Sequence, residues 1–147
     1  MKPLNEMNLN FYSRSSNEAF ARAAVAAFVS QLDPTVGELA DIKTAVSEAV
    51  TNCIVHAYRD VIGTVYINVR LFEGGKIIIK IRDRGCGIAD IKKAMEPLFT
   101  TAGDERAGLG FAVMQSFTDK VSVRSHVGTG TTVTLVKIMN RRDSDDE

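Results

Sequence analysis

The sequence predicts an α/β sandwich, in which helices cover one face of a mixed or antiparallel sheet. Apolar spacing indicates a short strand and two helices first, then a hairpin, a loop, a helix and a second hairpin. Strands and helices therefore occur in runs, whereas a doubly wound parallel fold would alternate them. The chain has 147 residues, of which 45% are hydrophobic, so we expect one domain with a buried core.

The first two elements are a strand and a helix. Residues 7–12 alternate apolar and polar side chains, as expected for a strand with one buried face. Ser15 and Glu18 have the spacing of a capping box, which predicts a helix to about residue 32. Glu18 and Arg22 are placed to pair across one helical turn. This helix is expected to bury the stripe Phe20, Ala24, Ala27, Phe28 and Leu32.

A second capping box, Thr35 with Glu38, predicts a longer helix. One stripe of this helix carries Glu48, Asn52 and His56 at equal spacing, so these side chains are expected to point the same way. The core stripe of the same helix is expected to be Leu39, Ile42, Val46, Ala49, Val50, Cys53 and Ala57.

The rest of the chain predicts two hairpins with a helix between them. The strands are residues 65–71 with 76–82 and residues 121–125 with 131–138. Glycines open the helix, which we expect at residues 109–117. Residues 83–108 are mostly turn-like, with one helical piece near 89–95, and a long loop of this kind is usually functional or disordered. The charged end, residues 140–147, is expected to fray.

Charge and composition bound the possible functions. Eighteen basic and eighteen acidic residues cancel, which argues against a general surface for nucleic acid or anionic membranes. No apolar run approaches the roughly 20 residues of a membrane-spanning helix, and the first residues lack a signal-peptide core. Cys53 and Cys86 lack the spacing of a metal site and are expected to be reduced thiols. These features predict a cytoplasmic protein.

Three glycine clusters follow the helix that carries Glu48 and Asn52. They are Asp83-Arg84-Gly85-Cys86-Gly87, Gly108-Leu109-Gly110 and Gly128-Thr129-Gly130-Thr131. Glycine lets the backbone approach a ligand closely, and the N-terminus of a helix binds phosphate. A carboxylate and an amide one helical turn apart supply the groups that a magnesium–nucleotide site further needs. The pattern therefore predicts a site for ATP or ADP with Mg²⁺.

The side chains suggest a role for each residue. Asn52 offers an oxygen ligand to Mg²⁺, and Glu48 could act as general base toward a hydroxyl near the γ-phosphate. Asp83 could accept a hydrogen bond from the adenine amino group, with Gly87 admitting the ring and Thr131 adding a contact. Each signal also has a plain structural explanation. Glu48 and Asn52 could form an exposed polar stripe, Asp83 could begin a turn, and Thr131 could be a β-favouring residue in a hairpin.

The second cluster, Gly108-Leu109-Gly110, offers free backbone N–H groups at the start of a helix. It is neither a Walker A loop nor a Rossmann fingerprint. Arg106, just before it, would stabilise charge on a transferred phosphoryl group, or would be a solvated surface charge. Thr100 and Thr101 could add hydroxyl contacts.

In order, the segments Glu48-Ala-Val-Thr-Asn52, Asp83-x-Gly85-x-Gly87, Gly108-Leu109-Gly110 and Gly130-Thr131 resemble the four sequence boxes of the GHKL superfamily, which includes gyrase and histidine kinases. Within it, residues 4–138 resemble the anti-sigma factor serine kinases, and most closely the sporulation anti-sigma F factors. The segments that carry this similarity are Phe20-Ala21-Arg22, Phe28–Pro34, Ser47–Asn52, Pro97–Thr101 and Glu105-Arg106. The resemblance implies a single Bergerat α/β sandwich over residues 1–147, with a mostly antiparallel sheet and an ATP lid at about 89–108.

The resemblance also implies a function. Members of this family form dimers that bind and inhibit a sigma factor, here of the sigma F type, and phosphorylate a serine of an anti-anti-sigma protein. Glu48 would be the base, Asn52 the Mg²⁺ ligand, Arg106 a γ-phosphate contact and Arg22 a contact to a protein partner. Nucleotide contacts would come from Asn52, Asp83, Gly85, Gly87, Thr100, Thr101, Gly108, Leu109, Gly110 and Thr131.

Three alternatives stay open at this point. The chain could be a nucleotide-gated sigma-binding module without phosphoryl transfer, although an intact Glu48 favours the kinase, because a pure binder needs no base there. It could also be a general-stress anti-sigma kinase, which shares the fold and the boxes. A histidine-kinase catalytic domain fits less well, because the residues ahead of Glu48 already belong to the fold and leave no phosphoacceptor helix.

Overall fold

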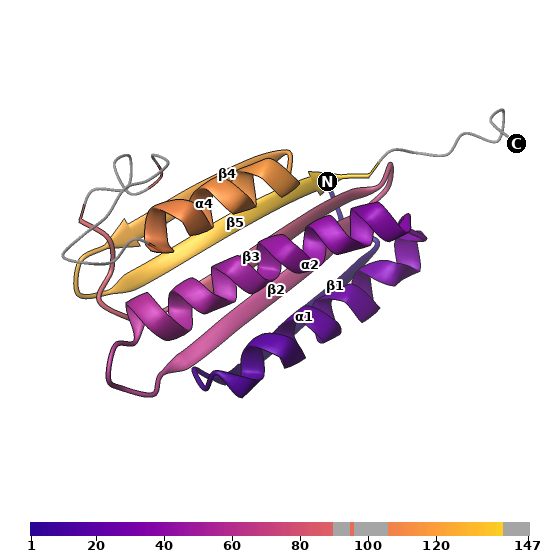
Figure 1. The fold of residues 1–147 in the computed structure, drawn as a ribbon. Helices are drawn as coiled ribbons and strands as arrows, with labels where there is room; N and C mark the ends of the chain where they lie inside the picture. The colour runs from indigo at the N-terminus through magenta and orange to yellow at the C-terminus, as the bar shows by residue number, and fades with distance from the viewer. Residues whose placement is uncertain (90–94, 96–105, 140–147) are drawn as a thin grey trace, which may run out of the picture.

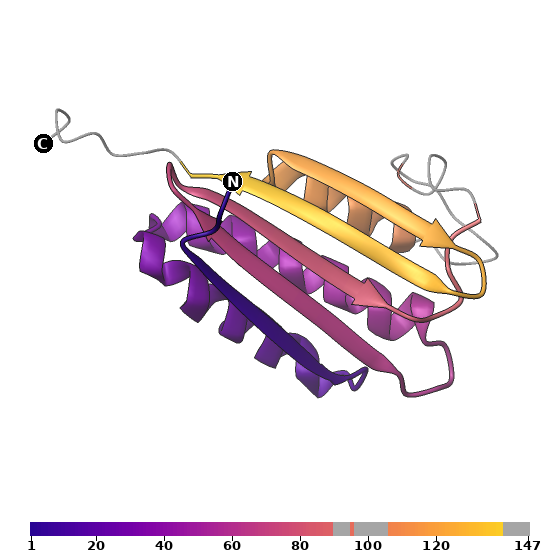
Figure 2. The ribbon, with the colours of Figure 1, turned by 180° about the vertical axis from the view of Figure 1, so that it is seen from behind.

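The computed structural model describes residues 1–89, residue 95 and residues 106–139, with the backbone alone for 106–109. These residues form two layers, a sheet and the helices that pack on one of its faces (Figure 1). Seen from behind, the other face of the sheet carries no helix of the described chain (Figure 2). The predicted α/β sandwich is therefore confirmed.

Five described strands form the sheet in the order β1-β2-β3-β5-β4, and each neighbouring pair is antiparallel. The strands are β1 (Asn5–Tyr12), β2 (Thr64–Phe72), β3 (Lys76–Asp83), β4 (Lys120–His126) and β5 (Gly130–Ile138). The two predicted hairpins, β2–β3 and β4–β5, are both present. Because β5 pairs with β3, the start of β5 lies beside the end of β3, and Thr131 is opposite Asp83.

The helices are α1 (Ser16–Val29), α2 (Val36–Thr51) and α4 (Arg106–Phe117), with a 3₁₀ turn at Ser30–Leu32 and a π-helical turn, η2, at Asn52–Ala57. Helix α2 lies between α1 and α4 (Figure 1). At its start the Thr35 hydroxyl accepts from the Glu38 N–H (3.0 Å), and the Glu38 carboxylate accepts from the Thr35 N–H (2.9 Å). The capping box predicted there is confirmed.

The core lies between helices α1, α2 and α4 and the inward face of the sheet. Along β2 and β3 the buried side chains alternate with more exposed ones, as the two-residue repeat of a strand requires. Fully buried members of this core include Ile42, Val46, Val50, Val65, Ile67, Ile77 and Leu135. This packing fixes α2, and with it Glu48, against the strands that end at the candidate site.

Helix α1 differs from the prediction in two respects. Its buried side chains are Ala21, Val25, Ala26 and Val29. Of the predicted stripe, Phe28 and Leu32 are partly buried and pack against this core. Phe20 is 49% exposed and contacts Phe11 of β1 edge-to-face, with ring centroids 6.1 Å apart. The prediction weighted the large aromatic side chain, whereas small and β-branched side chains fill the narrow space beside α2. Ser15 has helical backbone angles and makes no capping hydrogen bond, so the capping box predicted there is wrong.

The second half of the chain shows two further differences. The π-helical turn η2 was not predicted; its Tyr58 N–H donates to Cys53 O at 3.0 Å, five residues back, so this turn is wound more loosely than an α-helix. Helix α4 begins at Arg106, so Gly108 lies in its first turn rather than ahead of it. Most of the predicted loop, with its helical piece, and all of residues 140–147 lie outside the described residues.

Candidate functional site

Four of the predicted site residues, Asp83, Gly85, Gly87 and Thr131, lie at one end of the sheet. Asp83 is the last residue of β3, and Thr131 of β5 lies directly opposite it in the antiparallel ladder. The turn η2 passes the same end, where the Cys53 thiol contacts Asp83. Segments that are far apart in the sequence, two glycine clusters and the residues that follow α2, thus become neighbours.

Asp83 is buried, and its carboxylate accepts three hydrogen bonds from described residues. Oδ1 accepts from the N–H groups of Gly85 (2.9 Å) and Thr131 (3.3 Å), and Oδ2 accepts from the Cys53 thiol (3.6 Å). Burial raises the pKa of Asp83 above its ordinary value, while the three hydrogen bonds oppose this shift. The carboxylate is therefore held in one orientation, which is a requirement for specific recognition of a ligand.

Cys53 is the buried donor to this carboxylate. Burial, and then the charge of Asp83, raise the pKa of Cys53 well above its ordinary value. The thiol therefore stays protonated at neutral pH and donates its hydrogen. Cys53 and Cys86 are both free cysteines, and Cys86 is exposed.

Ser125 of β4 is a neighbour of the site that the sequence analysis missed. Its Oγ lies 2.7 Å from Thr131 Oγ1, accepts from the Ile88 N–H (2.7 Å) and donates to Gly130 O (3.1 Å). It thereby ties the loop that follows β3 to the buried Thr131. The β4–β5 register pairs Ser125 with Thr131, so a correct hairpin register would have been the signal for it.

Gly85 and Gly87 are required by the packing of the protein on itself. A Cβ on Gly85 would overlap the Ala57 carbonyl, and a Cβ on Gly87 would overlap the His126 carbonyl. Gly87 also has a φ of +81°, in the left-handed region that favours glycine. These two glycines seat the loop against η2 and against β4; their contact with a nucleotide stays a prediction.

Glu48 and Asn52 both face the second glycine cluster. A Cβ placed on Gly110 of α4 would lie 3.1 Å from Asn52 Oδ1 and 3.4 Å from Glu48 Oε2. The missing side chain of Gly110 thus lets α4 pass close to both polar groups. Asn52 Nδ2 is buried and has no hydrogen-bond partner among the described residues. A buried polar atom of this kind is unfavourable in the free protein and points to a ligand that completes it.

The chemistry of Asn52 fits a magnesium ion. The two ends of an amide have nearly the same shape, so a half-turn of this side chain places Oδ1 where Nδ2 now lies. An amide oxygen is a hard donor of the type that Mg²⁺ binds together with water and substrate phosphates. Glu48, one turn earlier on α2, is close enough to share the space beside Gly110.

The side chains of several predicted site residues lie outside what the structure describes. Arg106, Gly108 and Leu109 are described as helical backbone only, and Thr100 and Thr101 lie outside the described residues.

Across the part of the chain that the structure describes, no helix is long and apolar enough to cross a membrane. The same residues contain no group of three or more His, Cys, Asp or Glu that could hold a metal ion.

Arg22, the predicted partner contact, lies on α1. Its guanidinium is 3.4 Å from Glu18 Oε1, which confirms the predicted pair, and 3.4 Å from Ser47 Oγ. Ser47 directly precedes Glu48, so Arg22 joins α1 to the part of α2 that carries the candidate base. The Arg22 side chain is 40% exposed and therefore accessible to a second protein.

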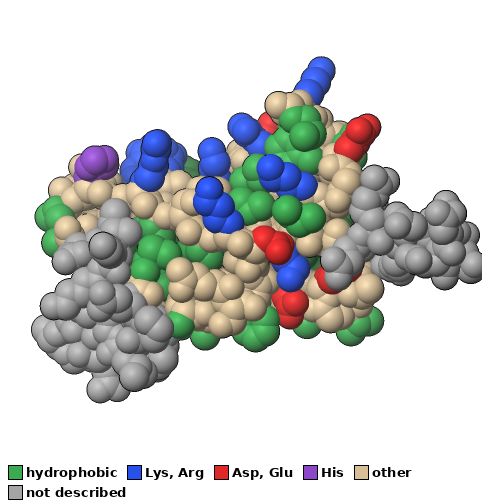
Figure 3. All heavy atoms as spheres, turned by 90° about the horizontal axis from the view of Figure 1, so that it is seen from above, with side chains coloured by type: hydrophobic (Ala, Val, Ile, Leu, Met, Phe, Trp, Pro, Cys, Tyr) green, Lys and Arg blue, Asp and Glu red, His purple; other side chains and the backbone are tan. Residues whose placement is uncertain are grey.

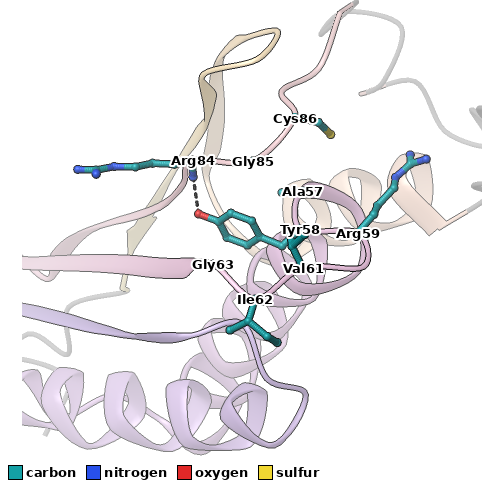
Figure 4. A pocket seen from close by; sticks show the side chains of 9 residues that line it. All are labelled: Ala57, Tyr58, Arg59, Val61, Ile62, Gly63, Arg84, Gly85 and Cys86. Carbon is teal, nitrogen blue, oxygen red and sulfur yellow. Dashed lines mark hydrogen bonds between the residues drawn. The ribbon is translucent and has the colours of Figure 1, made fainter.

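A hollow of about 370 Å³ opens beside the loop that follows β3 (Figure 4). Tyr58, which the sequence analysis did not single out, forms one wall; its hydroxyl accepts from the Arg84 N–H (2.6 Å) and donates to Thr64 O (2.7 Å). Burial raises the pKa of Tyr58 above its ordinary value. The remaining lining residues are Ala57, Arg59, Val61, Ile62, Gly63, Gly85 and Cys86.

Charge is balanced over the chain but not over its surface. Figure 3 shows Lys and Arg side chains gathered along one side of the face that it presents. On β3 and just beyond it, Arg82 and Arg84 both lie over the Tyr66 ring, with guanidinium carbons 4.5 Å and 5.1 Å from its centroid. Because side chains alternate along a strand, these arginines point away from the buried Asp83 between them.

Known proteins are similar in sequence to this chain over almost its full length. Residues 12–137 match the family described as a histidine kinase-like ATPase domain. An anti-sigma F factor of a Thermoanaerobacter species is 57% identical over 138 residues, which cover 93% of this chain and 96% of that protein. An anti-sigma F factor of Geobacillus thermodenitrificans is 56% identical over 135 residues, which cover 90% of this chain and 92% of that protein.

Solved structures share the fold. The RsbU and RsbW domains of a Mycobacterium tuberculosis protein align with a TM-score of 0.70 at 20% sequence identity. The alignment covers 95% of this chain and 33% of that one, so the chain spans a third of the solved protein. This likeness supports the two-layer architecture described above.

Proposed function

Because the chain belongs to the histidine kinase-like ATPase domain family and, within it, to the group of the anti-sigma F factors, we propose that it is an anti-sigma factor with protein-serine kinase activity. It binds ATP or ADP, inhibits a sigma factor of the sigma F type, and phosphorylates a serine of an anti-anti-sigma protein. It acts as a homodimer in the cytoplasm of a sporulating cell. The names of the relatives at 56–57% identity support the sigma factor as its partner.

One observation carries the kinase part of the proposal. Asn52 Nδ2, which is buried and has no hydrogen-bond partner among the described residues, belongs to a side chain that lies with Glu48 beside Gly110 of α4. A candidate ion ligand, a carboxylate and the backbone of α4 therefore lie close together. Phosphoryl transfer needs these components, because its catalysis consists largely of positioning and of offsetting charge.

The adenine end of the nucleotide is assigned to the end of the sheet. Asp83 Oδ2 accepts from the exocyclic amino group, since Oδ1 is already engaged by the N–H groups of Gly85 and Thr131. Thr131 Oγ1, held by Ser125, adds a hydroxyl on the same side. A carboxylate accepts from the 6-amino group of adenine and is repelled by the 6-oxygen of guanine, so this arrangement favours ATP over GTP.

The phosphate end is assigned to α2 and α4. The first turns of α4 offer backbone N–H groups and the positive end of the helix dipole to phosphate oxygens. Asn52 holds Mg²⁺, which offsets phosphate charge when bound. Glu48 accepts the proton of the substrate serine hydroxyl. At the same time the serine oxygen forms a bond to the γ-phosphorus, and the bond between the γ-phosphorus and the ADP oxygen breaks. Arg106, at the start of α4, opposes the charge on the transferred group.

The test is transfer from γ-labelled ATP with Mg²⁺ to the anti-anti-sigma protein encoded in the same genome. The variant Glu48→Gln keeps the size of the side chain and removes the base. We expect labelled serine with the unmutated protein, a loss of at least about a hundredfold in rate with Glu48→Gln, and unchanged ATP affinity. The matched control is Glu73→Gln, an exposed carboxylate in the β2–β3 turn at the opposite end of β3, and it should transfer normally.

The outcomes separate the kinase from its alternatives. Tight ATP binding without transfer by the unmutated protein would indicate a nucleotide-gated sigma-binding module. Loss of ATP binding in Glu48→Gln would show that Glu48 serves structure or nucleotide binding rather than proton transfer. Transfer to a general-stress antagonist in preference to the sporulation one would change the assigned sigma factor and leave the chemistry in place.

A further inference from the structure

A buried thiol contacts the carboxylate that is proposed to read adenine. Cys53 Sγ lies 3.6 Å from Asp83 Oδ2, and Cys53 is only 3% exposed. We infer that Cys53 is a positioning residue, and this inference rests on the proposed nucleotide site. The Cys53 S–H holds the Asp83 carboxylate so that one lone pair of Oδ2 faces the 6-amino group of adenine. Cys53 itself does not touch the nucleotide.

A count of acceptor sites supports this role. A carboxylate has about four lone-pair sites in its plane, two on each oxygen. The N–H groups of Gly85 and Thr131 take the two on Oδ1, and the Cys53 thiol takes one on Oδ2. One site on Oδ2 is left for a ligand, and its direction is set by the three donors together. Without the thiol, Oδ2 loses its only donor among the described residues. The terminal side-chain torsion of an aspartate has a broad distribution, so the carboxylate then rotates more freely.

Cys53 reaches Asp83 from the start of the π-helical turn. η2 begins at Asn52, and its Tyr58 N–H donates to Cys53 O at 3.0 Å. Asn52 faces Gly110 of α4, and the next residue, Cys53, faces the end of β3. Two adjacent residues therefore serve the two ends of the candidate site. A cysteine that only filled space would contact apolar groups, whereas this one also donates to a buried carboxylate.

The test compares ATP with the triphosphate of purine riboside, which lacks the 6-amino group. Dissociation constants are measured for the full chain and for the variants Cys53→Ala, which removes the donor, and Cys53→Ser, which keeps one. We expect Cys53→Ala to weaken ATP binding about fivefold to tenfold and to change binding of the purine riboside nucleotide less than about twofold. Cys53→Ser should restore ATP binding to within about twofold of the unmutated protein.

Val50→Ala is the matched control for lost volume. Val50 is a fully buried side chain of α2 without a polar group, so its truncation leaves a cavity and removes no donor. It should change the affinities for both nucleotides by the same small factor. Equal losses for both nucleotides in Cys53→Ala, or no loss for ATP, would overturn the positioning role.

A second readout needs no nucleotide. If Cys53 fixes the carboxylate, Cys53→Ala should accelerate hydrogen exchange of the Gly85 and Thr131 amides, which donate to Asp83, and Cys53→Ser should return it to the original rate. Unchanged exchange in Cys53→Ala would contradict the inference. Should the unmutated protein bind neither nucleotide, the proposed function fails, and the exchange rates still decide whether Cys53 positions Asp83.

Discussion

The backbone N–H of Thr131 donates to Asp83 Oδ1 at 3.3 Å, across the β3–β5 ladder and over a separation of 48 positions in the chain. The first and third glycine clusters are therefore joined by a direct hydrogen bond. Both residues are buried, with 5% and 7% of their surfaces exposed. The sheet register thus builds the proposed adenine end of the site, and the chemistry of Asp83 can be tested separately from the phosphate end.

Burial of Asp83 predicts a pH dependence of stability. Its pKa in the folded protein is raised above the ordinary 3.8, so its contribution to the free energy of unfolding is fully present below the ordinary pKa. That contribution is lost as pH rises through the folded pKa. We expect the free energy of unfolding of the unmutated protein to fall relative to that of Asp83→Asn over this window. Urea denaturation at a series of pH values measures it, and parallel curves would contradict the prediction.

Glu6 supplies a control of opposite sign. Hydrogen bonds from Asn68 and then Arg70 lower the pKa of this carboxylate in the folded protein. Its contribution is present above the ordinary pKa of 4.5 and is lost as pH falls through the folded value. In the same denaturation series, the unmutated protein should lose stability relative to Glu6→Gln toward low pH, the reverse of the comparison with Asp83→Asn.

The two candidate capping boxes predict different costs of truncation. Thr35→Ala removes the hydroxyl that accepts from the Glu38 N–H and should lower the free energy of unfolding by about 1 kcal/mol. Ser15→Ala is the matched control, because Ser15 makes no side-chain capping bond, and it should change stability by less than about 0.5 kcal/mol. Urea denaturation of both variants measures the difference, and equal losses would show that the Thr35 box does not stabilise α2.

Gly110→Ala tests the close approach of α4 to Asn52 and Glu48, at the proposed phosphate end of the site. The new methyl group would lie 3.1 Å from Asn52 Oδ1, so Asn52 or α4 must shift. We expect ATP affinity to fall roughly tenfold or more, in line with losses caused by small displacements at a site. Calorimetric titration with ATP and Mg²⁺ measures it.

Gly37→Ala is the control for adding a methyl group to a helix. Gly37 lies in the first turn of α2, and nothing lies within 4 Å of a Cβ placed there. This variant should raise the free energy of unfolding by about 0.5–1 kcal/mol and leave ATP affinity unchanged. If Gly110→Ala also binds ATP normally, the second glycine cluster is not part of the site.

Arg22→Ala tests the proposed partner contact on α1. The side chain is exposed enough to reach a second protein, and arginine is frequent among residues that dominate interfaces. We expect affinity for the sigma factor to fall about tenfold, with ATP affinity unchanged. Surface plasmon resonance measures the first and calorimetry the second. Arg124→Ala, an exposed arginine of β4, serves as control, and an equal effect there would point to general electrostatic attraction.

Local signals in the sequence were sufficient for most elements. The Thr35–Glu38 box and the alternation along β2 and β3 depend on neighbours within one element, and the structure confirms them. The Ser15 box failed because Ser15 itself has helical backbone angles. Phe20 is exposed because its burial depends on how α1 is rotated against α2 and β1. Propensity and spacing do not contain that rotation.

By itself the sequence determined the α/β class, the helices and the hairpins, and it predicted the residues of a nucleotide site, because periodicity, turn chemistry and motif order are local. Only the tertiary structure decided that Thr131 lies opposite Asp83, that Ser125 holds Thr131, and that Cys53 reaches the carboxylate. These relationships depend on strand register and on the packing of α2 and η2 against the sheet. Both are set by contacts between segments that are distant in the chain, so they exist only once the sheet and α2 have packed.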